Sequence, residues 1–472
     1  MGNNPFKEIA DFAFHNRVKR WIFLLLPSRI SVWLFRRFLD ADIERNSLSA
    51  AKFLVDAQKL YPSKYFLLLP NFLRFALRLA QTNLPDSFLR LFINSVAETR
   101  RHPARRKLIS EHIYKSTLNL DYRQTSAHGW KLISLALTGF GFIRAGTVAR
   151  RYCLEAALNE VLDGTASSRT LHLAIKGLLE GRRFGEAIKC IESHASDLDT
   201  NSTNITYGDY LALMGKRRPS FAKIKSEMIA PSDNLACDLI FNKSIALVAT
   251  GEITTLSGND IDQHDIVARV KFQGLSISLQ AKFAGTRCDI TSFTKDLVEM
   301  IVAKSATNSK FLETFTDVKL IVLKENIGSR IGSIPHRTMD VWAPTFLTTA
   351  TSGTLFLFDL LRFEPIKIKL FGFNHYTERQ IYNSELLDFY RSSDELKKVG
   401  LPKNWFDLSS HQKTSATIAN GFISHDPRSD FLLVKNLYEL SGLIDGTPEV
   451  LEILNLTADE YDERLEEMLG DW

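Results

Sequence analysis

Four short polar segments in the second half of the chain carry the residue types best suited to chemistry. They are residues 260–269, 349–353, 371–378 and 425–431, and each stands beside an apolar run. Their histidines can exchange a proton near neutral pH, and serine at the start of a helix brings hydroxyl and amide donors together. The segments therefore predict a site that holds an anionic group and moves a proton by histidine.

These segments belong to elements that alternate between strand and helix. Short apolar, β-branched runs predict strands at residues 244–250, 266–270, 318–323 and 366–372. Helical patterns lie between them, at residues 294–304 and 353–362. The alternation predicts an α/β fold with a doubly wound parallel sheet, over residues 241–472, that binds its ligand at the carboxyl ends of the strands. It ends in an acidic helical tail, residues 451–472, whose carboxylates we expect to be solvated.

The first half of the chain has a different pattern. From about residue 5 to residue 235, apolar residues recur at intervals of three and four, as in amphipathic helices. Three apolar segments contain or end in a glycine, spaced as in tetratricopeptide-like hairpins, at Gly139, at Gly177 or Gly181, and at Gly215. We predict an all-α helical-repeat domain over residues 1–240, with the hairpins toward its end.

The first two polar segments, taken in order, resemble motifs of the sialyltransferase family. Residues 261–269 match the close of the family's large motif, Ile-Asp-x-His-Asp-x-Val-x-Arg, at every stated position. Residues 351–353, before a helix and then a strand ending in Gly372 and Phe373, resemble the small motif.

The other two segments extend the resemblance. His375 with Tyr376 is similar to the family's third motif, and His425 is similar to the single histidine of its very small motif. The resemblance covers roughly residues 244–440 and leaves the helical half unexplained. It implies a nucleotide-binding domain and a glycosyltransferase that uses a CMP-activated sugar donor.

The chain departs from the family at two positions. The family's Gly-Asn turn after the first strand is Ala249-Thr250 here, and the asparagine two places beyond Arg269 is Lys271. The family's asparagines contact the donor nucleotide, so the resemblance implies a donor site at Thr250, Gly251, Arg269 and Lys271. Arg269 is equally well explained as a structural ion-pair residue. The departures leave the donor open between sialic acid and Kdo, which related transferases also take from CMP.

The residues that the motifs bring together suit the departure of CMP. CMP leaves as a phosphate monoester, and the amides of Ser352 and Gly353 at a helix N-terminus would stabilise its negative charge. His375 is placed to donate a hydrogen bond or proton to that phosphate, and His425 to take the proton of the acceptor hydroxyl. Taken singly, these segments are also explained as a helix cap and a capped turn.

The stereochemical course needs a different residue for each outcome. Inversion is a single displacement, with His425 as the base. Retention needs a carboxylate nucleophile, for which Asp289, expected just after a strand, is the first candidate and Asp265 the second. Asp265 is otherwise a residue that orients its loop. The departures at Thr250 and Lys271 favour the retaining, Kdo-type course.

No cofactor and no metal ion is expected. Asp260 and Asp262 have the Asp-x-Asp spacing that binds divalent cations in many nucleotide-sugar transferases, but there the motif follows a strand and here it precedes one. The chain has neither a dinucleotide fingerprint nor a Walker loop, which argues against NAD and ATP chemistry. We expect a CMP-sugar donor and a glycan acceptor, and no nucleic-acid partner.

The N-terminal segment suggests where the protein works. Residues 18–39 interleave aromatic and basic side chains, as an interfacial helix on an anionic membrane would, although a core helix with a solvated basic face is the alternative. The net charge of +5 is mild, and the four cysteines form neither a metal-ligand spacing nor a recognisable disulfide framework. We expect a cytoplasmic enzyme, peripheral on the inner membrane face.

Two functions of different classes fit these observations. One is a transferase acting on a surface polysaccharide or lipid-linked glycan, whose helical half positions the acceptor or binds partner enzymes of polysaccharide assembly. The other is a binding scaffold whose α/β half is a catalytically degenerate transferase, which the changes at Thr250 and Lys271 motivate.

Overall fold

The computed structural model describes most of the chain from residue 84 onward. The described residues are 84–198, 200–215, 231–272, 277–294, 297–298, 315, 317–324, 335–339, 343–378, 422 and 425–469. The membrane-surface segment predicted at residues 18–39 lies outside them. Across these described ranges, every helix is too short or too polar to cross a membrane.

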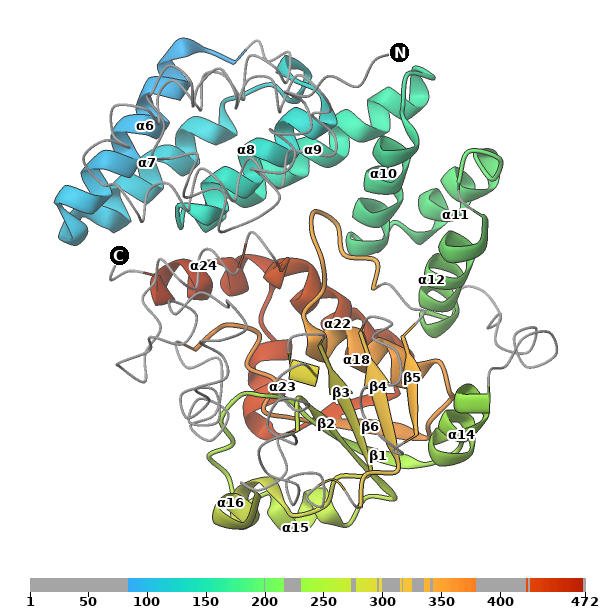
Figure 1. The fold of residues 1–472 in the computed structure, drawn as a ribbon. Helices are drawn as coiled ribbons and strands as arrows, with labels where there is room; N and C mark the ends of the chain where they lie inside the picture. The colour runs from blue at the N-terminus through green and yellow to red at the C-terminus, as the bar shows by residue number, and fades with distance from the viewer. Residues whose placement is uncertain are drawn as a thin grey trace, which may run out of the picture.

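Helices make up the first half of the described chain (Figure 1). They are α6 (Asp86–Arg101), η1 (Pro103–Arg105), α7 (Arg106–Leu118), η2 (Tyr122–Gln124), α8 (Ala127–Gly139), α9 (Ile143–Leu162), α10 (Ser168–Glu180), α11 (Phe184–Ser193), α12 (Thr200–Leu213) and α14 (Pro231–Ile240). The expected helix pairs α8–α9 and α10–α11 are present. The partner expected for α12, near residues 221–224, lies outside the described residues, and the repeat architecture stays a prediction.

A glycine lets α8 and α9 approach closely. A methyl group on Gly146 of α9 would lie 2.4 Å from the Thr138 hydroxyl oxygen of α8, which is closer than carbon and oxygen can pack. Ser134 of α8 also donates a hydrogen bond to the Gly146 carbonyl at 2.7 Å. The small residue therefore fixes the hairpin that carries much of the helical core.

A seven-stranded sheet forms the core of the second half. Its strands are β1 (Ser244–Val248), β2 (Ile266–Val270), β3 (Ile290–Phe293), β4 (Leu320–Leu323), β5 (His336–Thr338), β6 (Lys367–Phe371) and β7 (Ile444–Gly446). All neighbours are parallel, in the order β5-β4-β3-β2-β1-β6-β7. The predicted α/β fold is confirmed, and the order is that of a doubly wound sheet. From β1 the chain adds β2 to β5 on one side of the sheet and then returns to add β6 and β7 on the other side. This reversal of strand order, between β1 and β6, is where such sheets bind ligands.

Most helices of the second half connect these strands, and the last two follow β7. They are α15 (Gly258–Asp262), α16 (Ile277–Ala284), α18 (Ser352–Leu361), α22 (Pro427–Ser441), α23 (Pro448–Leu454) and α24 (Ala458–Met468). The predicted helix at 353–362 is confirmed as α18. Of the helix predicted at 294–304, only residues 297–298 are described and helical.

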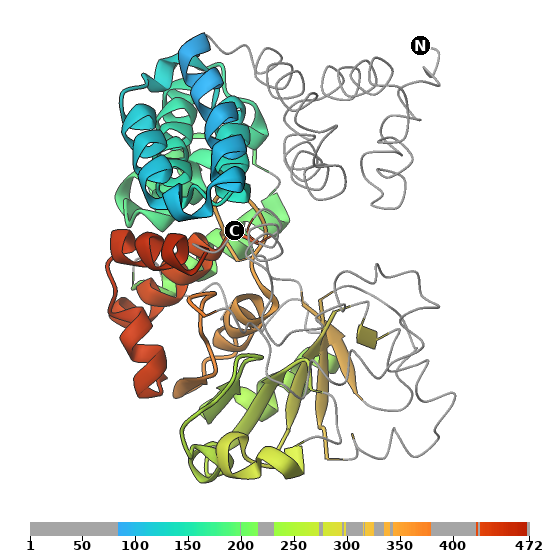
Figure 2. The ribbon, with the colours of Figure 1, turned by 90° about the vertical axis from the view of Figure 1, so that its left-hand side faces the viewer.

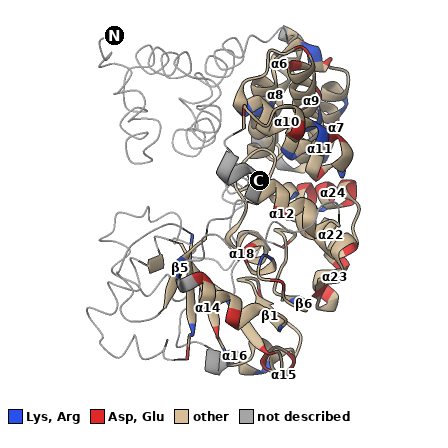
Figure 3. Ribbon diagram, turned by 90° about the vertical axis from the view of Figure 1, so that its right-hand side faces the viewer, with Lys and Arg blue, Asp and Glu red and all other residues tan. Residues whose placement is uncertain are grey.

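The C-terminal helices lie between the sheet and the helical half (Figure 2). The prediction that the carboxylates of residues 451–472 are solvated is wrong for some of them. Glu466 of α24 accepts hydrogen bonds from the Ser110 hydroxyl at 2.5 Å and from the Arg144 amide at 2.9 Å. Asp462 is 2 % exposed and pairs with Arg428. Figure 3 shows α24 in red beside the helical half, so its carboxylates join the two halves.

The two halves also share one hydrophobic core. Tyr210 of α12 lies with its ring centroid 6.2 Å from that of Phe358 on α18, and both side chains are buried. The same cluster of buried side chains continues from Ile175 on α10 to Ile245 on β1 and Leu437 on α22. Burial of this area in one cluster makes folding of one half depend on the other.

Candidate active site

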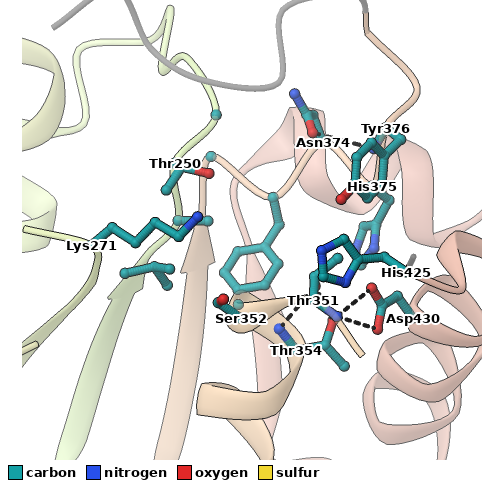
Figure 4. Close-up of a pocket in the computed structure, with 16 residues that line it drawn as sticks. Thr250, Lys271, Thr351, Ser352, Thr354, Asn374, His375, Tyr376, His425 and Asp430 are labelled. Atoms are coloured by element: carbon teal, nitrogen blue, oxygen red, sulfur yellow. Dashed lines mark hydrogen bonds between the residues drawn. The ribbon is translucent and has the colours of Figure 1, made fainter. Parts of the chain in front are cut away.

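A cleft opens at the carboxyl ends of β1, β2 and β6, at the reversal point of the sheet (Figure 4). It holds about 650 Å³ of empty space, part of it open to solvent. Five segments line it: the turns after β1, β2 and β6, the start of α18, and the segment that opens α22. Predicted site residues that line the cleft are Thr250, Gly251, Lys271, Ser352, Gly353, His375 and His425.

The cleft floor is backbone packed on backbone. The Gly251 amide donates a hydrogen bond to the Gly372 carbonyl at 3.2 Å. A methyl group on Gly251 would lie 2.3 Å from that carbonyl oxygen, and Gly372 has a φ of +67°. Only glycine fits both positions without displacing the turns after β1 and β6. These glycines therefore set the distance between the two sides of the cleft.

The N-terminus of α18 faces this floor. Thr351 caps the helix, and its hydroxyl oxygen accepts a hydrogen bond from the Thr354 amide at 3.4 Å. Ser352 and Gly353 form the first turn, where backbone amides have no partner within the helix. Phe373 lies against Gly353, since a methyl group there would be 3.3 Å from its ring. The cleft thus receives the positive end of a ten-residue helix.

Lys271 reaches into the cleft from the other side. It follows β2 with a φ of +58°, and its amide donates to the Ser292 carbonyl at 3.0 Å. In Figure 4 its side chain extends toward Thr250 and Ser352. The ammonium group and the α18 N-terminus therefore both raise the electrostatic potential of the cleft, which favours a phosphate.

His375 lies in a strained and largely apolar turn. His375 and Tyr376 have φ values of +44° and +63°, an unusual conformation for side chains of this size. The imidazole is 8 % exposed, and burial lowers its pKa to about 4. Its Nε2 has no hydrogen-bond partner within the described part of the chain. The ring is therefore neutral at pH 7, which suits donation of a hydrogen bond to a ligand better than donation of a proton.

Side chains of α22 and α24 contact the turn at His375. The Tyr461 hydroxyl of α24 donates to the His375 carbonyl at 2.6 Å. The Tyr461 ring stacks on Phe431 with centroids 4.1 Å apart, and Phe431 in turn meets the His375 ring edge to face. The C-terminal helix thus stabilises a turn that is unfavourable on its own.

His425 lies at the entrance to α22, opposite the α18 N-terminus. It pairs with Thr349 in an isolated β-bridge, and the Asp426 amide donates to the Thr349 carbonyl at 3.2 Å. The Asp426 carboxylate caps α22 by accepting the Ser429 amide at 3.1 Å. The backbone at His425 and directly after it is therefore fixed.

Asp430, in the first turn of α22, is a site residue that sequence reasoning missed. Its carboxylate oxygens accept the Thr351 amide at 3.0 and 3.3 Å, which ties α22 to the start of α18. The residue is 2 % exposed, and burial raises the pKa of its carboxyl to about 7. Figure 4 shows it beside His425. Its sequence signal is a carboxylate directly before an apolar run, five residues after His425.

A buried ion-pair network connects the helical half to the start of α22, next to His425. Arg150 of α9 donates to both Asp426 oxygens at 2.8 and 2.9 Å and to the Ser429 hydroxyl at 2.6 Å. The same guanidinium donates to Glu180 of α10 at 2.5 and 2.9 Å. Asp426 also accepts the Leu347 amide at 2.9 Å, which anchors the segment before α18. The network therefore fixes the residue that follows His425.

Two predicted catalytic carboxylates lie elsewhere, because they precede strands. Asp289 was expected after a strand, but it immediately precedes β3 and lies 2.7 Å from the Lys319 ammonium and 2.9 Å from Arg287. Asp265 precedes β2 and accepts the Ser244 amide at 2.9 Å. In a parallel sheet the amino ends lie at the edge opposite the cleft. Neither carboxylate is part of the candidate site.

Arg269 lies in β2 but its side chain does not line the cleft. Its guanidinium donates to the Arg287 carbonyl at 2.7 Å and to the Ala284 carbonyl at 2.5 Å. These contacts fix the connection between α16 and β3. Of the two interpretations of Arg269, the structural one fits this geometry, in which two backbone carbonyls accept from its guanidinium.

The Asp-x-Asp pair has protein partners. Asp260 accepts from the Lys369 ammonium at 2.7 Å, and Asp262 accepts the amides of Thr286 and Arg287 at 2.8 and 3.0 Å. Among the residues that the structure describes, no three acidic, histidine or cysteine side chains are grouped as a metal site would need. The pair thus has a structural role in joining α15 to its neighbours.

Known proteins give no direct guidance on what the cleft binds. No protein-family model matches this chain, and no curated protein matches it either. Function is therefore inferred from the motifs and from the geometry of the cleft.

The raised pKa of Asp430 predicts how stability depends on pH. The folded-state pKa of about 7 exceeds the value of 3.8 expected when unfolded, so the folded state binds the proton more tightly. The contribution is complete below about pH 4 and is lost as pH rises through 7, by up to about 4 kcal/mol. Asp430→Asn should remove this slope in denaturant titrations at pH 5 and pH 8. An unchanged slope would show that the carboxyl titrates normally.

Removing Arg150 should leave two buried carboxylates without their cation. Arg150→Met is expected to lower the free energy of unfolding by about 3–5 kcal/mol, because breaking a buried pair leaves uncompensated charge. The neighbouring Arg151 is exposed, and Arg151→Met is the matched control with an expected change within about 0.5 kcal/mol. Equal unfolding free energies for both variants in urea would contradict the assigned network.

Proposed function

We propose that this chain is a glycosyltransferase that moves a CMP-activated ulosonic acid, Kdo or sialic acid, onto a surface polysaccharide or lipid-linked glycan. The proposal rests on where the segments that resemble sialyltransferase motifs lie in the structure. Three of the four segments that resemble sialyltransferase motifs in order, at residues 349–353, 371–378 and 425–431, meet in one cleft at the reversal point of a parallel sheet, together with the turns after β1 and β2. Residues 260–269 do not line the cleft.

The phosphate of CMP would bind between α18 and Lys271. The Ser352 and Gly353 amides and the Ser352 hydroxyl supply hydrogen-bond donors, and Lys271 supplies a full positive charge. These groups stabilise an anion without a divalent ion. The lysine stands where the family has asparagine, and it would offset the loss of that amide by a direct attraction to phosphate.

The leaving group would also contact His375. A neutral imidazole with a free Nε2 in an apolar wall donates a directional hydrogen bond and keeps water away from the bond that breaks. The negative charge that develops on the phosphate oxygen as the glycosidic bond breaks strengthens that hydrogen bond. His375 is thus proposed as a donor to the leaving phosphate, not as its acid.

Transfer would proceed with inversion. His425 takes the proton of the acceptor hydroxyl while its oxygen attacks the anomeric carbon, and CMP departs with the electron pair of the broken bond. Of the carboxylates in the described part of the chain, Asp430 is the one that lines the cleft, and both its oxygens accept the Thr351 amide. Asp289 lies at the opposite edge, which removes the support for the retaining course.

The helical half would hold the acceptor beside this cleft, because its Arg150 and Glu180 lie next to the segment of the cleft that contains His425. Membrane contact through residues 18–39, a cytoplasmic location and docking of partner enzymes stay proposals from the sequence.

Nucleotide binding should need Lys271 and no metal. Lys271→Met is expected to raise the Kd for CMP about tenfold, since a hydrogen bond to a charged group is lost. Lys282→Met, on the exposed surface of α16, is the control and should bind as the wild type does. Calorimetry in excess EDTA measures both. Binding that vanishes on chelation would restore the metal interpretation of Asp260 and Asp262.

Transfer should need His425. His425→Ala is expected to release CMP from CMP-Kdo or CMP-sialic acid about 10²- to 10⁴-fold more slowly while it still binds CMP, because a positioned base is lost. Product configuration by NMR tests inversion in the same series. Wild-type protein that binds CMP but releases none from either donor, with glycan acceptors present, would support the inactive scaffold instead.

A further inference from the structure

The carboxylate of Asp430 lies at the same helix end that is proposed to hold the donor phosphate. Its two oxygens accept the amide of Thr351, the residue that caps α18, at 3.0 and 3.3 Å. Ser352 and Gly353, whose amides would bind the phosphate, are the next two residues of the chain. Because consecutive α-carbons are about 3.8 Å apart, the carboxylate lies within roughly 10 Å of both amides. Asp430 also lines the cleft itself.

An anion bound at this helix end therefore has a carboxylate as its neighbour. Two negative charges at such a separation repel each other, and the repulsion is stronger where protein rather than water surrounds them. Asp430 is 2 % exposed, so little solvent screens its charge, and the first turn of α18 has no ionisable side chain that could offset it. Protonation of the carboxylate removes the repulsion, whereas the α18 amides keep their attraction for the anion. Binding of an anion and binding of a proton thus favour each other.

Two other acidic groups lie near Asp430, on α22 and on α24. The Asp430 amide donates to the Asp426 carbonyl at 2.9 Å, and Arg150 of the helical half donates to both Asp426 carboxylate oxygens. Burial raises the pKa of Asp426, but the guanidinium and two backbone amides outweigh burial and bring the pKa below its ordinary value. Tyr461 donates to the Pro427 carbonyl at 3.2 Å, and burial raises the pKa of its hydroxyl well above 10. Near neutral pH, Asp426 therefore stays charged and Tyr461 stays neutral.

The basic side chains that line the cleft with Asp430 are Lys271, His375 and His425. The Lys271 ammonium ordinarily keeps its proton up to about pH 10, and burial lowers the pKa of His375 to about 4. The buried Nε2 of His375 has no hydrogen-bond partner among the described residues, so it can donate to an anion in the cleft. Burial raises the pKa of Asp430 to about 7, and His425 ordinarily titrates at about pH 6.5. Between about pH 5.5 and pH 9, the charge of the cleft therefore changes at Asp430 and His425.

We propose that Asp430 is a positioning residue of the anion site and takes up one proton from solvent when a phosphate group binds at the α18 N-terminus. The proton returns to solvent when the anion leaves. That the natural anion is the phosphate of a CMP-linked donor rests on the proposed function, whereas the coupling applies to any anion held at this helix end. Figure 4 shows Asp430 beside His425. A neutral carboxyl there favours the uncharged imidazole that a base requires, because no negative charge of Asp430 stabilises the imidazolium.

Calorimetry on the full chain measures this coupling. Sulfate is the first probe and the methyl ester of CMP is the second, because neither changes its phosphate or sulfate charge near neutral pH. Heats of binding at pH 8 in two buffers of different ionisation enthalpy give the number of protons taken up, which should be roughly half a proton per bound anion. Sulfate should bind about tenfold more tightly at pH 6 than at pH 9, since the anion favours the protonated carboxyl.

Three variants assign the proton to one residue. Asp430→Asn keeps an oxygen for the Thr351 amide but cannot titrate, so it should lose most of the proton uptake and bind sulfate at pH 9 about tenfold more tightly than the wild type. A purely structural role for Asp430 predicts weaker binding instead. His425→Gln removes the other group that titrates and should keep the uptake at pH 8. Asp459→Asn changes an exposed carboxylate in the first turn of α24, and this matched control should behave as the wild type does.

The two probes separate the coupling from the proposed function. Sulfate binding without proton uptake at pH 8, uptake that Asp430→Asn retains, or uptake lost in His425→Gln would overturn the coupling. The wild type and His425→Gln decide it even where Asp430→Asn does not fold. Binding of the CMP ester without proton uptake contradicts the coupling alone. Sulfate that binds with proton uptake, together with no binding of the ester, contradicts the nucleotide function alone, and failure of both probes to bind contradicts both.

Discussion

The buried guanidinium of Arg150 connects the helical half of the molecule to the corner of the cleft next to His425. It bonds Glu180 within the helical half and Asp426 and Ser429 at the start of α22. Burial of a cation is favourable only when every donor is matched, and here three partners from two helices match it. Because Asp426 also accepts the Leu347 amide, the same interaction places the segment before α18. The helical half thus fixes the position of residues beside the cleft.

The topology of the sheet supplies the rest of the site. Parallel strands on either side of the reversal between β1 and β6 point their carboxyl ends to one edge, so turns far apart in sequence meet there. Gly251 and Gly372 let the two turns touch through their backbones. In the proposed reaction, helix-terminal amides and Lys271 would hold the anion, and a histidine would transfer the proton. The acidic C-terminal helices complete the arrangement, since Tyr461 holds the His375 turn.

The sequence predicts most of this frame and part of the site. β1, β2, β4, β6 and α18 follow from their long apolar runs, whereas β3, β5 and β7 have three or four residues each, some polar, and give too weak a signal. Asp289 was assigned to the cleft because pattern alone does not tell which end of a short strand a residue occupies. Asp430 was missed because a carboxylate in the first turn of a helix is usually explained by the helix dipole. Its burial against Thr351 depends on tertiary contacts.

The α18 N-terminus and Lys271 are proposed to form the phosphate site of a CMP-linked donor. The most direct test is a crystal structure of the full chain grown with saturating CMP. Electron density for the nucleotide is expected at the reversal point of the sheet, with its phosphate within hydrogen-bonding distance of the Ser352 and Gly353 amides and of the Lys271 ammonium. Nucleotide density at another place, or an empty cleft at saturating CMP, would contradict it.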